Sequence, residues 1–152
     1  MNTDHAVLSP IKRALPTSEF TGAIISALYA VWNELGYGHR ERYYQQAFAK
    51  VFEESGLPFE QEKSYPLLFR GKALGHQRLD FLVNDALIVE LKVGRVLNAN
   101  YFAQVLAYLK VTAYPLALIA LFAPQGVRVK RIIDSGNATA PSAFIGVSAA
   151  QQ

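Results

Sequence analysis

The fold of this chain depends on two short segments, Arg78-Leu79-Asp80-Phe81-Leu82-Val83 and Leu87-Ile88-Val89-Glu90-Leu91-Lys92-Val93. In the second segment, residues alternate with the period of two that is typical of a β-strand. Its odd-numbered positions form a purely apolar face, whereas Glu90 and Lys92 project from the opposite face. Asn84-Asp85-Ala86 lies between the segments and indicates a turn, so we predict two antiparallel strands.

The length of that turn decides whether Asp80 and Glu90 can meet. A three-residue loop pairs Val83 with Leu87 and places the two carboxylates on the same face of the sheet. A tight two-residue turn would shift the pairing by one residue and place them on opposite faces. A site that uses both acids therefore requires the three-residue loop.

Two carboxylates held side by side repel each other unless a cation lies between them. A divalent ion that prefers oxygen ligands, such as Mg²⁺, is the usual solution. Lys92 could then position or activate an attacking water molecule and stabilise charge on a phosphate. Spacing alone favours a simpler interpretation, in which Asp80 pairs with Arg78, and Glu90 and Lys92 form a row of surface ion pairs.

Hydrophobic periodicity and turn residues predict the remaining elements outward from these strands. The expected order is helix, helix, three strands, helix and two strands, which indicates an α/β fold with a mixed sheet flanked by helices. A turn-rich link at residues 70–75 is expected to join the first two strands. The helices are predicted at residues 18–35, 40–55 and 98–111, and the strands at 60–69, 77–83, 87–93, 116–122 and 127–133.

Length and composition suit one domain with a substantial core, because the 152 residues are 51% hydrophobic and 18% charged. We expect an N-terminal arm at residues 1–17, the domain at 18–134 and a loose tail at 135–152. The absence of cysteine excludes disulfides and thiolate metal sites. The N-terminal residues lack the apolar run of a signal peptide, and residues 116–122 are too few to span a membrane, so we expect a cytoplasmic protein.

The net charge of +3 is compatible with a polyanionic partner but does not require one. The charge is concentrated in the predicted fold, where residues 37–133 contain 13 Lys or Arg and 8 Asp or Glu. Nucleic acid is therefore one candidate partner, and an ordinary basic surface is the alternative.

The wider chain resembles the GxxExxY proteins, a group within the PD-(D/E)XK nuclease-like superfamily. Gly38-His39-Arg40-Glu41-Arg42-Tyr43-Tyr44 reproduces the motif for which the group is named. The two segments around Asp80 and Glu90, followed by Gln104-Val105-Leu106-Ala107-Tyr108, are similar to the family's later blocks and occur in the same order. The resemblance covers residues 20–133, although Leu79 replaces the superfamily's nominal proline before Asp80.

The resemblance implies a restriction-endonuclease-like core, with Asp80 and Glu90 as metal ligands and Lys92 as the catalytic lysine. It also implies that Glu41 reaches the same metal from an early helix. On a later helix, Gln104 and Tyr108 would lie beside the active site. Further nucleic-acid contacts or supporting residues are expected at Arg78 and Arg95.

Simpler roles remain open for several of these residues. Tyr44 lies on the apolar stripe of its helix and is more readily explained as a core residue, and Gly38 as a loop residue. Glu41 could favour a helix N-terminus electrostatically. Tyr108 could have its hydroxyl at the rim of the core.

The leading hypothesis is a nuclease that depends on Mg²⁺, with Mn²⁺ as an alternative, and hydrolyses phosphodiester bonds in DNA or RNA. A homodimer would be one way to engage two strands, and no membrane partner is expected. The alternatives are a non-catalytic nucleic-acid-binding or DNA-repair accessory module on the same fold, and a protein-interaction scaffold.

Overall fold

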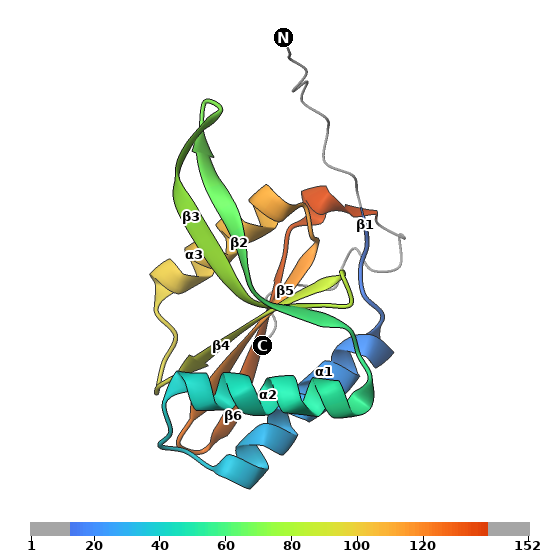
Figure 1. Cartoon of the computed structure of the whole chain (residues 1–152), viewed down its shortest axis with the longest axis vertical. Coiled ribbons are helices and arrows are strands. Elements are labelled where there is room, and N and C mark those ends of the chain that lie inside the picture. Colours follow the sequence, from blue (N-terminus) through green and yellow to red (C-terminus); the bar gives the residue numbers. More distant parts are fainter. Residues whose placement is uncertain (1–12, 140–152) are drawn as a thin grey trace.

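The computed structural model describes residues 13–139 and confirms the predicted order of elements (Figure 1). Two-residue strands flank this order at either end, and a short 3-10 helix precedes the last one. The elements are β1 (Arg13–Ala14), α1 (Ser18–Leu35), α2 (Glu41–Ser55), β2 (Phe59–Phe69), β3 (Lys72–Val83), β4 (Leu87–Val93), α3 (Ala99–Thr112), β5 (Leu116–Ala123), β6 (Gly126–Ile133), η2 (Ser135–Asn137) and β7 (Ala138–Thr139).

The five long strands form one mixed sheet in the order β2-β3-β4-β5-β6. Neighbouring strands are antiparallel except for β4 and β5, which are parallel and are joined through α3. Every residue of β5 is buried, in agreement with its wholly apolar sequence. The sheet thus has the α/β architecture that the sequence predicted.

Helices cover both faces of the sheet. The apolar stripes of α1 and α2 pack on one face, against the odd-numbered residues of β4 and the even-numbered residues of β5. The stripe of α3 packs on the other face, where it contacts Ile88, Ala117 and Ile119. These two clusters of buried side chains form the core.

The turn between β3 and β4 has the predicted length. Val83 pairs with Leu87 across the loop Asn84-Asp85-Ala86, and the ladder continues to the pair Phe81 and Val89. Asn84 and Asp85 adopt positive φ angles of 53° and 50°, a conformation that these two residue types tolerate well. The next opposed positions in this register are Asp80 and Glu90.

The hairpin of β2 and β3 is longer than predicted. The sequence indicated a turn-rich link over residues 70–75, but the turn consists of Arg70 and Gly71 alone, and β3 begins at Lys72. Both turn residues have positive φ, 49° and 80°, as in the two-residue turns that match the twist of antiparallel strands. Gly75 therefore continues the ladder, where it pairs with Leu67, and the hairpin projects well beyond the sheet (Figure 1).

The chain segments on either side of the domain are joined by a small parallel pairing of β1 with β7. Asn137 is buried next to this pairing, and its amide donates to the carbonyls of Leu109 and Tyr114. The first residues of the expected tail therefore take part in the fold, whereas residues 1–12 and 140–152 lie outside the described part. None of the helices at residues 13–139 is long and apolar enough to cross a membrane.

The loop between α1 and α2 is fastened by Tyr44, which is fully buried. Its hydroxyl donates to the carbonyl of Gly36 and accepts from the N–H of His39, and its ring stacks on Phe122 at 4.5 Å between centroids. Gly38 within the loop has a φ of 111°, which favours glycine. Both residues thus have structural roles, and together they set where α2 begins.

We predict that Tyr44→Phe lowers the free energy of unfolding by about 1–3 kcal/mol, because it removes the two hydrogen bonds that the Tyr44 hydroxyl makes with the loop. Urea unfolding followed by circular dichroism would measure the change. Tyr43→Phe is the matched control, because the Tyr43 hydroxyl is exposed and bonds only to Arg42. Equal stability of the two variants would contradict this role for Tyr44.

Candidate active site

The candidate site lies where β3 and β4 separate. The backbone ladder between β3 and β4 ends at the pair Phe81 and Val89. Beyond it, two carboxylate side chains accept hydrogen bonds from backbone N–H groups. The N–H of Asp80 donates to Glu90 Oε2 at 2.9 Å, and the N–H of Leu91 donates to Asp80 Oδ2 at 2.7 Å. Each carboxylate therefore binds the backbone of the opposite strand.

A local reversal of β3 allows this arrangement. Leu79 packs in the cluster under α3, whereas Phe81, two residues later, packs under α1 and α2. In regular β-structure both would lie on the same face. Opposite the reversal, Glu62 on β2 has a φ of 53° and interrupts the pairing of β2 with β3. The strand thus turns over at Asp80, whose side chain lies in the gap between the strands.

Glu90 and Lys92 lie on the α3 side of β4 and share Tyr101 as a partner. Only 3% of the Glu90 surface is exposed, and its Oε1 accepts a hydrogen bond from the Tyr101 hydroxyl at 3.2 Å. The Lys92 ammonium lies 4.4 Å from the centroid of the Tyr101 ring, which is a cation–π contact. One aromatic residue thus orients both the acid and the lysine.

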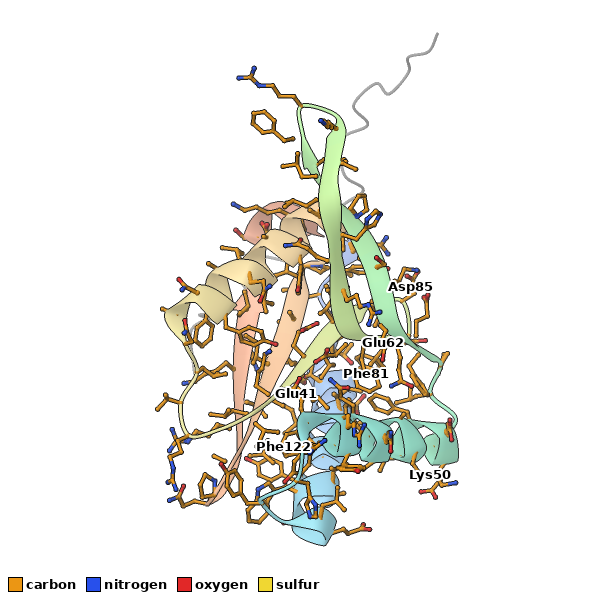
Figure 2. The ribbon with its side chains drawn as sticks, turned by 60° about the vertical axis from the view of Figure 1, so that its left-hand side comes forward. Glu41, Lys50, Glu62, Phe81, Asp85 and Phe122 are labelled. Carbon is orange, nitrogen blue, oxygen red and sulfur yellow. The ribbon has the colours of Figure 1, made fainter. Side chains whose placement is uncertain are left out.

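Helix α2 brings two more polar residues toward the same point, Glu41 in its first turn and Gln45 one turn later. The Gln45 side chain hydrogen-bonds Asp80, and Glu41 is close enough to Asp80 and Lys92 for their charges to shift its pKa. Figure 2 shows Glu41 on the side of α2 that faces the sheet. Side chains from both faces of the sheet therefore lie close to Asp80: those of α2 on one face, and Glu90 and Lys92 on the other.

Burial raises the pKa of all three carboxyl groups. It raises the pKa of Glu90 to about 8, and the negative charge of Asp80 acts in the same direction. The pKa of Asp80 is also raised by burial, against the opposing effects of the Leu91 N–H and Lys92. Burial likewise raises the pKa of Glu41. The site therefore disfavours several negative charges at once.

A cavity of about 690 Å³ opens beside this cluster on the α3 side of the sheet. Lys92 and Tyr101 belong to its wall, and Gln104 lines it from the next turn of α3. Tyr108 is buried further along the helix, where burial and the charges of Glu90 and Asp80 raise its pKa to about 12. The full lining is Gln77, Lys92, Val93, Val96, Leu97, Asn98, Asn100, Tyr101, Ala103, Gln104 and Leu121.

Two arginines expected near the site have other positions. Arg78 forms a salt bridge with Glu62 at 3.2 Å, so it does not neutralise Asp80 as the simpler sequence interpretation supposed. Arg95 is exposed in the loop after β4 and does not line the cavity. Glu90 and Lys92 are not a surface ion-pair row either, because Glu90 is buried.

The donor set suits a hard divalent cation held by few protein ligands. Within residues 13–139, no group of three or more His, Asp or Glu side chains is arranged to hold a metal ion. Mg²⁺, however, is commonly bound by one or two carboxylates, completed by waters and substrate phosphate oxygens. Asp80 and Glu90 provide such a pair, and a cation would offset the burial of their charges, which is the main cause of their raised pKa values, as well as the repulsion of Asp80 on Glu90.

Sequence reasoning missed Tyr101 and Gln45. Gln45 lies four residues after Glu41, and the helical period could have placed both on one face. Tyr101 lies three residues before Gln104 on α3, but nothing in the sequence indicates that its hydroxyl reaches Glu90. That contact follows from the way α3 packs on the sheet.

Comparisons with known proteins agree with the fold. A family model described as the PD-(D/E)XK nuclease superfamily matches residues 18–132. Among solved structures, the chain is similar to the crystal structure of SSO0001, with a TM-score of 0.50 and 18% identity; the match covers 84% of this chain and 62% of that chain. The chain thus spans less than two thirds of SSO0001, and the likeness concerns the fold alone. No curated protein matches.

We predict that, in EDTA, the free energy of unfolding falls as the pH rises from the ordinary Glu value of 4.5 to about 8. In this window the unfolded chain has released the Glu90 proton and the folded chain retains it, so rising pH favours unfolding. One proton contributes a slope of at most about 1.4 kcal/mol per pH unit. Urea unfolding at several pH values would measure it.

Glu90→Gln should make this slope shallower, because glutamine does not titrate. Glu54→Gln, on the exposed side of α2, should leave the slope unchanged. A slope that is the same in the wild type and Glu90→Gln would show that Glu90 is not the titrating group.

Proposed function

This chain belongs to the PD-(D/E)XK nuclease superfamily, and from that membership we propose that it is a metal-dependent nuclease that hydrolyses phosphodiester bonds in DNA. RNA is the second substrate class. The observation that carries the proposal is the pair of adjacent carboxylates, the half-buried Asp80 and the buried Glu90, which lie beside Lys92 at a large cavity. Within the superfamily, residues 38–44 support assignment to the GxxExxY group.

Asp80 and Glu90 would hold the divalent cation, for which we propose Mg²⁺, with Mn²⁺ as a substitute. When bound, the cation would act as a Lewis acid toward water and the phosphate. Glu41 would support the same site from α2, and Gln45 would keep the Asp80 carboxylate oriented by its hydrogen bond. These supporting contacts from α2 matter because a carboxylate that binds a metal must be held in one orientation.

Lys92 would stabilise the negative charge that develops on the phosphate in the transition state. Its ammonium borders the cavity and is held over the Tyr101 ring, which limits the positions it can adopt. Tyr101 thus acts as a positioning residue for both Lys92 and Glu90. From the cavity wall Gln104 would contact the substrate or an ordered water, and Tyr108 would support the wall from behind.

A cationic position on the edge strand extends this site across the sheet. Lys92 pairs with Leu121 on β5, which in turn pairs with Arg128 on β6. Residues paired directly across strands project on the same face, so Lys92 and Arg128 lie about 10 Å apart on either side of Leu121. We propose that Arg128 binds a backbone phosphate next to the one that is cleaved.

A non-catalytic nucleic-acid-binding module on the same fold is the second candidate. It is favoured by one observation, that the described residues contain no three-ligand metal group. In such a module Lys92 would only bind nucleic acid. Its removal would therefore weaken the affinity for nucleic acid, and the wild type would show no cleavage. A homodimer that engages two strands is compatible with either function.

We predict that Asp80→Asn abolishes both Mg²⁺ binding and cleavage, because it removes one of two ligand carboxylates. Lys92→Met should retain metal binding but cleave about a hundredfold more slowly or worse, because it removes only transition-state charge stabilisation. Calorimetric titration with Mg²⁺ and Mn²⁺ would measure binding. Cleavage would be measured on single-stranded, duplex and branched DNA and on RNA.

Glu54→Gln serves again as the control and should match the wild type in both assays. A well-folded wild type that neither binds metal nor cleaves any of these substrates would refute the nuclease proposal. Cleavage that survives in Asp80→Asn would place the active site elsewhere.

A further inference from the structure

The hairpin of β2 and β3 ends in an arm, residues 67–76, that the rest of the domain does not cover. Every residue from 67 to 76 is exposed, and the arm projects away from the helices (Figure 1). The hairpin is anchored nearer its base, where Tyr65 and Leu79 pack in the cluster under α3. The arm is nevertheless a defined structure, because its ladder continues to the final pair, Phe69 and Lys72.

The arm carries large apolar side chains that have no large apolar partner across the hairpin. Leu68, Phe69 and Leu74 are each more than half exposed. Leu68 faces only the methyl group of Ala73, and the register shift in the ladder leaves Leu74 unpaired. Cross-strand pairs normally stabilise a hairpin. These side chains add little to the fold, and their exposure indicates a binding surface.

The charge of the arm points to the kind of partner. Residues 67–76 contain two cations, Arg70 and Lys72, and no Asp or Glu. Arg70 and Lys72 lie at the tip, where the Arg70 guanidinium is 5.1 Å from the centroid of the Phe69 ring. An apolar surface bordered by cations is complementary to nucleic acid, whose bases are apolar on their faces and whose phosphates are anionic.

The arm and the candidate active site lie on the same strand. Eight residues separate Lys72 from Asp80 on β3. At the rise of an extended strand, this places the tip about 27 Å from the carboxylates. The same length of B-form duplex contains about eight base pairs.

We propose that this arm is a second nucleic-acid contact, which holds a duplex about eight base pairs away from the phosphate in the active site. Phe69 and Leu68 pack against or between bases, and Arg70 and Lys72 bind the flanking phosphates. This inference rests on the proposed nucleic-acid substrate and adds a contact that the catalytic cluster does not provide. A second copy of the chain is a poorer fit, because two such tips would carry charges of the same sign.

The test compares duplexes that can and cannot reach from the active site to the arm. The probes are fluorescein-labelled, hairpin-capped DNA duplexes of about 20 and about 6 base pairs. Anisotropy would be measured with the full chain in EDTA, so that binding is observed without cleavage. The double variant Leu68→Ala, Phe69→Ala should weaken binding of the long duplex at least about fivefold and leave the short duplex unaffected.

Salt dependence tests the cations separately. Removal of Arg70 or Lys72 by alanine should each reduce the slope of log affinity against log salt by roughly 0.9, the value for one phosphate contact. Lys50→Ala is the control, because Lys50 lies on α2 at the opposite end of the molecule from the tip (Figure 2). All these positions are exposed, so circular dichroism and thermal unfolding should match the wild type.

Equal affinity of the double variant and the wild type for the long duplex would overturn the proposal. So would a wild type that binds neither duplex at low salt. If the variant instead converts a dimer to a monomer in sedimentation velocity while its DNA affinity is unchanged, the arm serves a second copy. Length-dependent binding in EDTA, together with no cleavage in the separate assays with Mg²⁺ and Mn²⁺, would support the arm while refuting the proposed nuclease.

Discussion

The site depends on one set of hydrogen bonds between β3 and β4. There the carboxylates of Asp80 and Glu90, in place of backbone carbonyls, accept from backbone N–H groups of the opposite strand. A sheet normally satisfies every N–H along a ladder, and a strand that leaves the ladder exposes unpaired groups. Here the two side chains accept those N–H groups, so β3 can leave β4 without an unsatisfied donor at Asp80 or Leu91. The same hydrogen bonds hold two acids close together, one buried and one half-buried, which no arrangement selected for stability alone would require.

Three elements must be placed correctly for this pair to become a site, and each is placed by a different interaction. The buried hydroxyl of Tyr44 fixes the loop before α2 and thereby the start of the helix that carries Glu41. The packing of α3 brings Tyr101 to Glu90 and under Lys92. The three-residue turn sets the register of β3 against β4. Substitutions far from the carboxylates can therefore disturb them.

The sequence was sufficient for the order of the elements, because hydrophobic periodicity and turn residues act locally. It also predicted the register at Asp80 and Glu90, since a period of two leaves only two alternatives and the chemistry required one of them. The expected metal and catalytic roles stay predictions. Pattern reasoning did not find the reversal of β3 at Asp80, the positive φ of Glu62 or the contact of Tyr101, which arise from tertiary packing. It also interpreted both Gly71 and Gly75 as part of a turn-rich link. Only Gly71, in the tight turn, has a positive φ, whereas Gly75 pairs with Leu67 in the ladder.

The order of strands in the sheet also limits how the protein can associate. The outer strands are β2 and β6, whose free edges could in principle continue the sheet into another molecule. Proline at position 66 removes a backbone donor from β2, and charged Arg128, Lys130 and Arg131 follow one another closely along β6. Such features discourage edge-to-edge pairing and the aggregation that follows from it. Any dimer of this protein would therefore be built from helices, loops or the faces of its hairpin, and a continuous sheet across two subunits is disfavoured.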